Sequence, residues 1–287
     1  MTSAVFDARR CMLGEGPLWH PRRKQLFWFD ILNNRLMSRR DDQPIGWDFD
    51  ERVSAAGWID DDTLLIASET RLMTFGLETG KTTTLTPLEA DLSNTRSNDG
   101  RADPCGGFWI GTMGKSAQTA AGALYRWYRG TLRQLHAGLT IPNSLCFAPD
   151  RSAAYFSDTA KGTVFRQPLD PQTGWPEGPA DPWLDLRPEG LNPDGAVTDS
   201  DGTLWIAQWG AGRVAGYSAQ GRFVSALTVP ARHTSCPAFG GDDLQTLFVT
   251  SALEDIDADT TRAEPTNGCT FALPAPAKGR PEPQVIL

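Results

Sequence analysis

A small set of acids and amides occupies one position of a recurring pattern in this sequence. Counting back six residues from the turn that ends each of six similar segments gives Glu15, Ala55, Asn98, Asn143, Asp194 and Ser235. Five of these residues are polar, although the residues around them are mainly Pro, Leu, Trp, Ala, Val, Cys and Phe. Polar exceptions to an apolar pattern are typical of functional sites. We therefore take this position as the candidate site.

Convergence of these side chains on one axis favours a bound metal ion. Carboxylates that are brought together raise each other's pKa unless a cation or hydrogen-bond donors compensate. Glu15, Asp194 and the amide oxygen of Asn143, with Asn98 as a further candidate, form an all-oxygen set. Such a set suits hard cations, so we predict one divalent ion, with Ca²⁺ favoured and Mn²⁺, Mg²⁺, Zn²⁺ or Fe²⁺ as alternatives. The competing interpretation is that Asn98, Asn143 and Asp194 only cap strand ends.

The pattern that carries these residues repeats six times along the chain. Each unit centres on a short apolar cluster after a turn, and the centres, roughly 40 to 50 residues apart, are Phe27, Leu65, Trp109, Tyr155, Trp205 and Phe248. Further apolar segments flank each cluster, separated by Asp, Gly and Pro turns, which indicates strands. The sequence therefore predicts an all-β fold, a six-bladed β-propeller of four-stranded antiparallel blades. A β-sandwich or two smaller β domains is the alternative.

The whole chain, residues 1–287, is interpreted as one propeller domain. A closed ring requires the two ends of the chain to meet. We predict that residues 3–10 (SAVFDARR) and 283–287 (PQVIL) supply strands of one shared blade, which would remove a free sheet edge.

Composition excludes several classes of partner. A formal net charge of -8 argues against nucleic acid, whose binding needs clustered Lys and Arg. The N-terminus lacks the apolar run of a signal peptide, and no later stretch approaches the roughly 20 apolar residues of a membrane helix. We expect a cytoplasmic protein with no nucleic-acid or membrane partner, either a monomer or a weak homo-oligomer. Its five widely spaced cysteines, without a C-x-x-C pair, are expected to be reduced and mostly buried.

Four stretches resemble, in order, the signature regions of the SMP-30/gluconolactonase family, also called regucalcin-like. They are LGEGPLWHP (13–21), RSNDGRADPCGGFWIGTM (96–113), IPNSLCFAPD (141–150) and NPDGAVTDSDGTLWIAQWG (192–210). The resemblance spans essentially the whole chain. It implies a six-bladed propeller that binds one divalent metal through the positions of Glu15, Asn143 and Asp194.

The same resemblance implies a substrate site and a reaction. Arg96 and Asn98 match substrate contacts, Asp99 lies beside them, and Asp194 matches the general base. The implied activity is hydrolysis of a sugar (aldono) lactone to the aldonic acid, as in bacterial pentose or hexose oxidation. An acidic contact that some relatives have in the loop after GTM is missing here, so the sugar does not transfer. The alternatives are hydrolysis of another ester, such as an aryl ester or organophosphate, and a non-catalytic binding propeller.

Other conspicuous residues fit the structure of the fold better than its chemistry. Three scattered histidines are too few for a triad or a zinc site. The pattern leaves open whether Trp209 and His233, which lie close to the candidate position, reach the substrate. The acidic run from Glu254 to Asp259 lacks the Gly and terminal Glu of an EF-hand loop and is interpreted as solvated.

Overall fold

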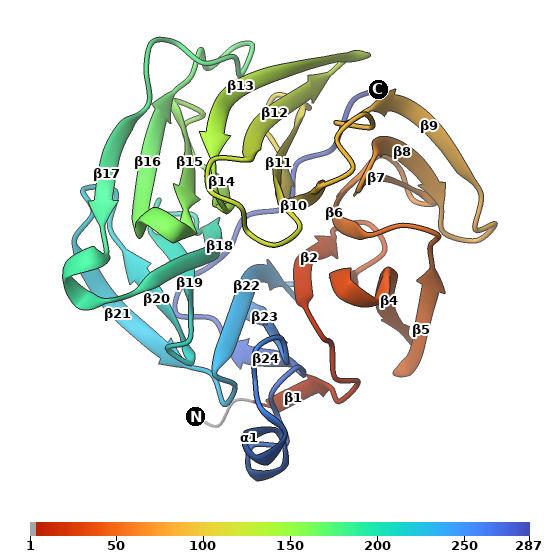
Figure 1. Ribbon diagram of the computed structural model, residues 1–287, viewed down its shortest axis with the longest axis vertical. Coiled ribbons are helices and arrows are strands. Elements are labelled where there is room, and N and C mark those ends of the chain that lie inside the picture. Colours follow the sequence, from red (N-terminus) through yellow and green to blue (C-terminus); the bar gives the residue numbers. More distant parts are fainter. Residues whose placement is uncertain (1–3) are drawn as a thin grey trace.

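The computed structural model describes residues 4–287, and nearly all of its regular structure is short strands. The strands form six four-stranded sheets that surround a central axis (Figure 1). In every sheet, neighbouring strands are antiparallel. The six-bladed β-propeller predicted from the repeats is therefore confirmed.

The first three blades follow each other along the chain. Blade one contains β2 (Gly14–His20), β3 (Gln25–Asp30), β4 (Arg35–Arg40) and β5 (Gln43–Asp48). Blade two contains β6 (Val53–Trp58), β7 (Thr63–Ser68), β8 (Arg71–Gly76) and β9 (Thr82–Pro87). Blade three contains β10 (Thr95–Ala102), β11 (Phe108–Gly114), β12 (Gly122–Tyr128) and β13 (Thr131–Leu139).

The remaining strands build blades four to six. Blade four contains β14 (Pro142–Phe147), β15 (Ala153–Asp158), β16 (Thr163–Pro168) and β17 (Asp181–Asp185). Blade five contains β18 (Asn192–Thr198), β19 (Leu204–Trp209), β20 (Arg213–Tyr217) and β21 (Phe223–Thr228). Blade six contains β22 (His233–Gly240), β23 (Thr246–Ala252), β24 (Thr270–Pro274) and β1 (Ala4–Asp7). Short 3-10 turns, η1 (Ile31–Asn33), η2 (Thr159–Lys161) and η3 (Arg187–Glu189), and one helix, α1 (Ala258–Ala263), complete the elements.

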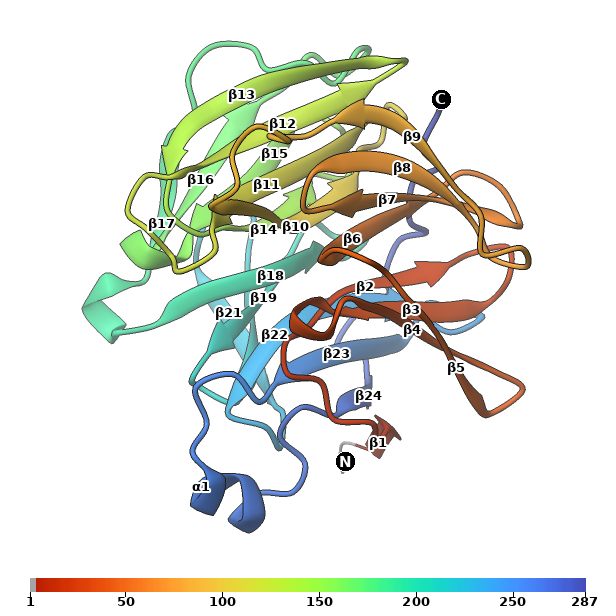
Figure 2. The same ribbon diagram turned by 45° about the vertical axis from the view of Figure 1, so that its right-hand side comes forward.

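Blade six is closed by strands from both ends of the chain. In it, β1 pairs antiparallel with β24 and places Ala4 opposite Ala272 (Figure 2). The strand predicted at residues 283–287 is wrong, because this segment forms no strand and crosses beneath the ring instead. There Val285 N donates to Trp58 O and Ile286 N to Gly106 O, each at 2.9 Å. Pro281 and Pro283 explain the difference, because proline has no N–H to donate to a sheet ladder.

The apolar core is divided among the junctions between blades. Among residues 4–287, six clusters of buried side chains each join two adjacent blades, and the cluster of blades one and two also includes Ala252 of blade six. Phe27 of β3, for example, packs in one cluster with Leu64 of β7, and Trp109 of β11 packs in another with Phe156 of β15. Each blade therefore buries both faces against its neighbours, and the ring fixes the inner strands that line the axis. Four of the five cysteines are buried and Cys105 is half-buried, all as free thiols.

The innermost strand of every blade contains a break in its pairing with the second strand. The breaks lie between Glu15 and Leu18, Val53 and Ala55, Ser97 and Gly100, Asn143 and Cys146, Pro193 and Ala196, and Thr234 and Pro237. A bulge of this kind bends the strand and redirects its side chains. The six bulges all lie at the candidate position identified in the sequence.

Candidate functional site

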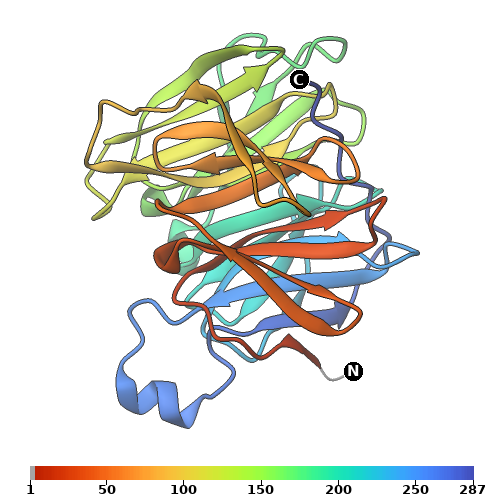
Figure 3. The same cartoon turned by 90° about the vertical axis from the view of Figure 1, so that its right-hand side faces the viewer.

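A cavity of about 500 Å³ lies at the axis of the ring, beside the loop that leads into α1. In the side view of Figure 3, α1 projects from one side of the ring and the two ends of the chain lie at the other. Predicted site residues that line the cavity are Glu15, Arg96, Asn98, Asn143 and Asp194. Its volume suits a small molecule. The structure thus brings together five of the six residues singled out in the sequence.

Glu15 and Asp194 are buried carboxylates that face the same cavity. Burial raises the pKa of Glu15 to about 8, and the charge of Asp99 adds to the effect. The pKa of Asp194 is also raised well above its usual value, first by burial and then by the charge of Glu15. Within residues 4–287, no Lys, Arg or His forms a salt bridge with either group. Two acids are therefore held together without a salt-bridge partner, and the charge of Arg96 in the same cavity offsets only part of the effect on Glu15.

Asn143 lines the same cavity, and hydrogen bonds to both ends of its amide fix the orientation of the group. Its Nδ2 donates to Thr159 Oγ1 at 2.8 Å, and the Thr159 hydroxyl in turn donates to the Pro193 carbonyl at 2.6 Å. Asn143 Oδ1 accepts a hydrogen bond from Asn98 Nδ2 at 3.0 Å. The chain continues to Arg96, whose Nη1 donates to Asn98 Oδ1 at 2.8 Å. These bonds fix which way each amide points.

The donor chemistry of the cavity fits a divalent cation. Two buried carboxylates without a salt-bridge partner and one amide oxygen are the ligands that hard cations prefer. Residues 4–287 contain no group of three or more His, Cys, Asp or Glu side chains arranged to hold a metal. The candidate set of Glu15, Asn143 and Asp194 therefore depends on the asparagine for its third ligand.

The sequence predicts one shared strand position for Glu15, Asn98, Asn143 and Asp194. In the structure these residues occupy two adjacent positions. Glu15 and Asn143 pair with the second strand immediately before the bulge, opposite Phe29 and Ser157. Asn98 and Asp194 instead lie within the bulge and have no partner in the ladder. One register step normally reverses the direction of a side chain. The bulge allows residues on both sides of that step to line the same cavity.

Asp99 does not line the cavity, although it follows Asn98 directly. Successive residues of a strand point to opposite faces, and the Asp99 carboxylate is directed away from the cavity to accept a hydrogen bond from Leu145 N at 2.8 Å. It lines a smaller space of about 10 Å³ lower in the channel, with Gly100 and Arg101. The structure therefore gives no support to a substrate contact by Asp99.

One wall of the cavity contains residues that were not among the predicted site residues. Trp209 and Lys115 line it, and His233 stacks behind Trp209, with ring centroids 4.3 Å apart and planes inclined by 16°. Glu254 and Asp255 also line it. Asp255 is exposed, in keeping with a solvated loop, but Glu254 is half-buried, so that interpretation is wrong for Glu254. Their only sequence signal was proximity to the end of a strand in the sixth repeat.

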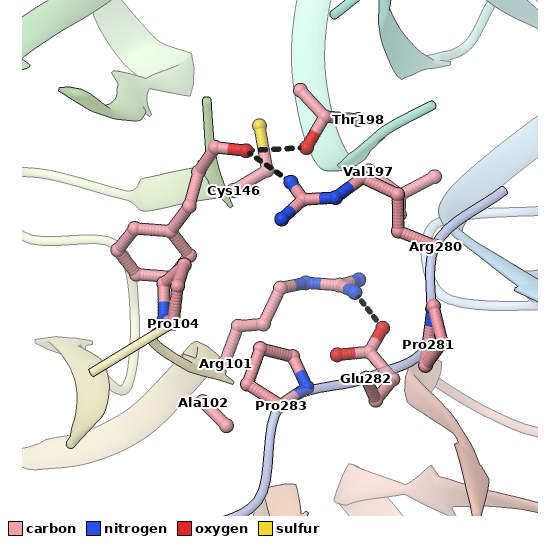
Figure 4. Close-up of a pocket in the computed structure, with 11 residues that line it drawn as sticks. Arg101, Ala102, Pro104, Cys146, Val197, Thr198, Arg280, Pro281, Glu282 and Pro283 are labelled. Atoms are coloured by element: carbon pink, nitrogen blue, oxygen red, sulfur yellow. Dashed lines mark hydrogen bonds and ion pairs between the residues drawn. The ribbon is translucent and has the colours of Figure 1, made fainter. Parts of the chain in front are cut away.

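The opposite end of the channel is filled by protein. The C-terminal segment passes across it and places Glu282 against Arg101 in a buried salt bridge (Figure 4). Arg280 lies beside this pair and donates to the Phe147 carbonyl at 3.4 Å. The space left among these residues is about 30 Å³, which is water-sized. A ligand therefore reaches the candidate site from the end of the channel where the cavity lies, and not from the end closed by the C-terminal segment.

Comparison with known proteins assigns the chain to a family. The family model described as SMP-30/Gluconolactonase/LRE-like region matches residues 13–253. The chain belongs to this family.

No helix among residues 4–287 is long and apolar enough to cross a membrane.

Relatives with assigned names cover nearly the full chain. A pentonolactonase of Haloferax volcanii is 36% identical, over 95% of this chain and 94% of the relative. A 6-deoxy-6-sulfogluconolactonase of Pseudomonas putida is 35% identical, over 95% of this chain and 94% of the relative. The crystal structure of a calcium-binding protein, regucalcin, from Agrobacterium tumefaciens matches with a TM-score of 0.98 at 40% identity, covering 100% of this chain and 98% of that one.

Proposed function

We propose that this protein is a metal-dependent hydrolase that opens a sugar (aldono) lactone to the aldonic acid. The observation that carries the proposal is the pair of buried carboxylates, Glu15 and Asp194, beside the oriented amide oxygen of Asn143 in a cavity of small-molecule size. The names of the relatives, a pentonolactonase and a 6-deoxy-6-sulfogluconolactonase, support a lactone as the substrate. Calcium is the favoured ion, which the calcium-binding structural relative supports.

Lactone hydrolysis requires a polarised carbonyl, an activated water molecule and a stabilised oxyanion. A divalent cation held by Glu15, Asn143 and Asp194 would supply Lewis-acid polarisation of the lactone carbonyl. Asp194 accepts the proton of the attacking water, because a carboxylate held at the reaction centre is suited to general-base catalysis. The proton then passes to the ring oxygen as the C–O bond breaks, which yields the hydroxyl of the open acid.

Arg96 and Asn98 position the substrate in this proposal. Arg96 is buried at the cavity wall, and its Nη1 already bonds the Ser97 carbonyl and Asn98 Oδ1. Its remaining N–H groups are free to donate to the hydroxyl or carbonyl oxygens of a sugar. Asn98 holds both Arg96 and Asn143 in place, so it couples the substrate contacts to the ligand set.

A substrate panel tests the proposal directly. The purified chain, stripped with chelator, is assayed with added Ca²⁺, Mn²⁺, Mg²⁺, Zn²⁺ or Fe²⁺ against glucono-, arabinono- and xylono-lactones, an aryl ester and an organophosphate. We expect metal-dependent acid release from at least one aldonolactone and little turnover of the other esters. Full lactonase activity in metal-free protein would overturn the metal-dependent mechanism, and turnover of only the aryl ester or organophosphate would overturn the lactone assignment.

A further inference from the structure

The wall formed by Trp209, His233 and Glu254 is built from three blade-end segments that hold one another in place. The ring of Trp209 at the end of β19 stacks on His233 at the start of β22. His233 Nδ1 donates to the Glu254 carbonyl at 2.7 Å, since a carbonyl oxygen only accepts. The Glu254 backbone is fixed a second time, because its N–H donates to the Met12 carbonyl at 2.9 Å. A rigid backbone thus carries the Glu254 side chain at the cavity.

The Glu254 carboxylate has no hydrogen-bond donor from within residues 4–287. It is half-buried and lines the cavity, and Asp255 beside it lines the same wall. The backbone of Asp255 has a φ of 59°, a left-handed conformation that non-glycine residues adopt uncommonly and that is often found at functional sites. Both carboxylates are therefore available to the hydroxyl groups of a ligand.

Each positive charge that lines the cavity has an acid nearby: Lys115 is paired with one directly, and Arg96 is influenced by one through space. Lys115 Nζ forms a salt bridge with Glu69 and donates to the Ser93 carbonyl at 2.8 Å. Burial lowers the pKa of Arg96 to about 10, and among the acids that oppose this effect Glu254 acts most strongly. Arg52 also acts on the Glu254 carboxyl, but it lines a neighbouring cavity.

The balance of charges among the residues that line the cavity indicates which ligands it can bind. Four carboxylates, Glu15, Asp194, Glu254 and Asp255, face the cavity together with two cations, Arg96 and Lys115. A divalent ion offsets the first two acids, and the remaining acids at least match the two cations. No positive charge is then left over for an anionic substituent on the substrate, whereas neutral hydroxyl groups find unoccupied acceptors.

We propose that Glu254 is a specificity-determining residue that selects neutral polyhydroxy lactones and rejects lactones whose exocyclic group carries a phosphate, sulfonate or carboxylate. The inference rests on the proposed lactonase function and names its substrate class. Glu254 accepts a hydrogen bond from an exocyclic hydroxyl, offsets part of the Arg96 charge through space, and repels a negative group at the same place. Like charges brought together in a poorly solvated site disfavour binding strongly.

The test compares two lactones that differ only in an exocyclic phosphate, D-glucono-1,5-lactone and its 6-phospho derivative. In the wild-type chain we expect kcat/KM for the neutral lactone to exceed that for the phosphorylated one by about 100-fold or more. Glu254→Gln removes the charge with little change in shape and leaves the Arg96 charge less offset. We expect it to raise kcat/KM for the phosphorylated lactone by about tenfold. It should also lower kcat/KM for the neutral lactone, because the exocyclic hydroxyl then donates to an uncharged amide oxygen, so the preference narrows from both sides.

A binding measurement gives a second readout that does not depend on turnover. The Kd values of gluconate and 6-phosphogluconate, measured by calorimetry, should show the same preference and the same shift in Glu254→Gln. Asp41→Asn, which removes one exposed acid on the turn between β4 and β5, is the matched control and should leave both ratios unchanged.

The outcomes separate this inference from the proposed function. If the wild-type chain hydrolyses the neutral lactone but treats the phosphorylated one equally well, the specificity role is overturned. An unchanged preference in Glu254→Gln, or an equal shift in Asp41→Asn, overturns it as well. If neither lactone, nor any other in the panel, is hydrolysed with any metal, the proposed function fails first.

Discussion

The two ends of the central channel contain similar charged residues in opposite circumstances. At the open end, Glu15 and Asp194 are buried together without a basic partner among residues 4–287, and the pKa of each is raised. At the closed end, Glu282 is equally buried but forms a salt bridge with Arg101. One end therefore stores unfavourable electrostatics that a ligand can relieve, and the other has its charges satisfied by the protein itself.

This difference separates residues that serve chemistry from residues that serve the ring. A buried acid without a counter-charge lowers the stability of the free protein, so its presence in a folded chain indicates a ligand. A buried ion pair at the base of the ring instead ties the C-terminal segment to blade three. The predictions below exchange or remove these charges, beginning with the largest expected effect.

Replacing Asp194 by Asn at the open end should cause the largest loss of activity. The variant keeps the shape of the side chain but loses a proposed metal ligand and the general base, and removal of a general base alone costs about 10² to 10⁴ in rate. We expect kcat/KM on the best lactone of the panel to fall by about 10³ or more. The metal-free variant should unfold cooperatively at an equal or higher temperature, because one of two repelling acids is gone.

The control for Asp194→Asn is Asp185→Asn, which removes an exposed acid in blade four. It should leave the rate and the metal requirement unchanged. Near-normal turnover by Asp194→Asn, or a collapse of its cooperative unfolding transition, would contradict the assignment of Asp194 to chemistry rather than structure.

At the closed end, Glu282→Gln should have the opposite result: it should lower stability and leave activity unchanged. Removing one partner of a buried ion pair leaves Arg101 uncompensated, which costs about 3 to 5 kcal/mol. We expect the free energy of unfolding in urea to fall by about that amount, with kcat/KM nearly unchanged at temperatures where the variant is folded. A double variant, Arg101→Met with Glu282→Leu, should regain most of the lost stability. A stability loss below about 1 kcal/mol would show that the pair contributes little to the ring.

The sequence predicted the propeller but not the course of the C-terminal segment. The six-fold repeat is local: each blade carries its own alternation and turns, so Phe27 and Trp205 could be assigned to second strands without knowing their neighbours. The course of the C-terminal segment depends on contacts with distant blades, such as Trp58 O accepting from Val285 N. Only Pro281 and Pro283 hinted that this segment would not join a sheet.

The candidate site was predictable to the same local extent. Counting from the turns identified Glu15, Asn143 and Asp194 because the six inner strands have similar lengths. The count did not reach Asp99 or Glu254. Asp99, named only for its place beside Asn98, points away from the cavity, and the place of Glu254 at the cavity depends on contacts with Met12 and His233. Residues placed by tertiary contacts leave no periodic signal in one sequence.

A smaller effect is expected from Thr159→Val, which tests how Asn143 is oriented. The substitution removes the acceptor for Asn143 Nδ2 and the donor to Pro193 O, while it keeps the size of the side chain. Groups that orient metal ligands typically contribute 10- to 100-fold to affinity, so we expect Ca²⁺ affinity measured by calorimetry to fall about tenfold. Thr163→Val is the matched control and should bind Ca²⁺ normally, because within residues 4–287 the exposed Thr163 hydroxyl bonds only the Lys161 carbonyl. Equal affinities in the two variants would remove Thr159 from the support of the site.

The smallest effect should come from Arg280→Met at the closed end, and it sharpens the contrast with Glu282. Arg280 reaches the Phe147 and Pro149 carbonyls only at 3.4 and 3.5 Å and forms no salt bridge within residues 4–287. Methionine preserves much of the aliphatic packing of the side chain. We expect the free energy of unfolding to change by less than about 1 kcal/mol and the activity to be unaffected. A loss as large as that of Glu282→Gln would mean that the channel is closed by the whole C-terminal segment acting together, rather than by the Arg101–Glu282 pair.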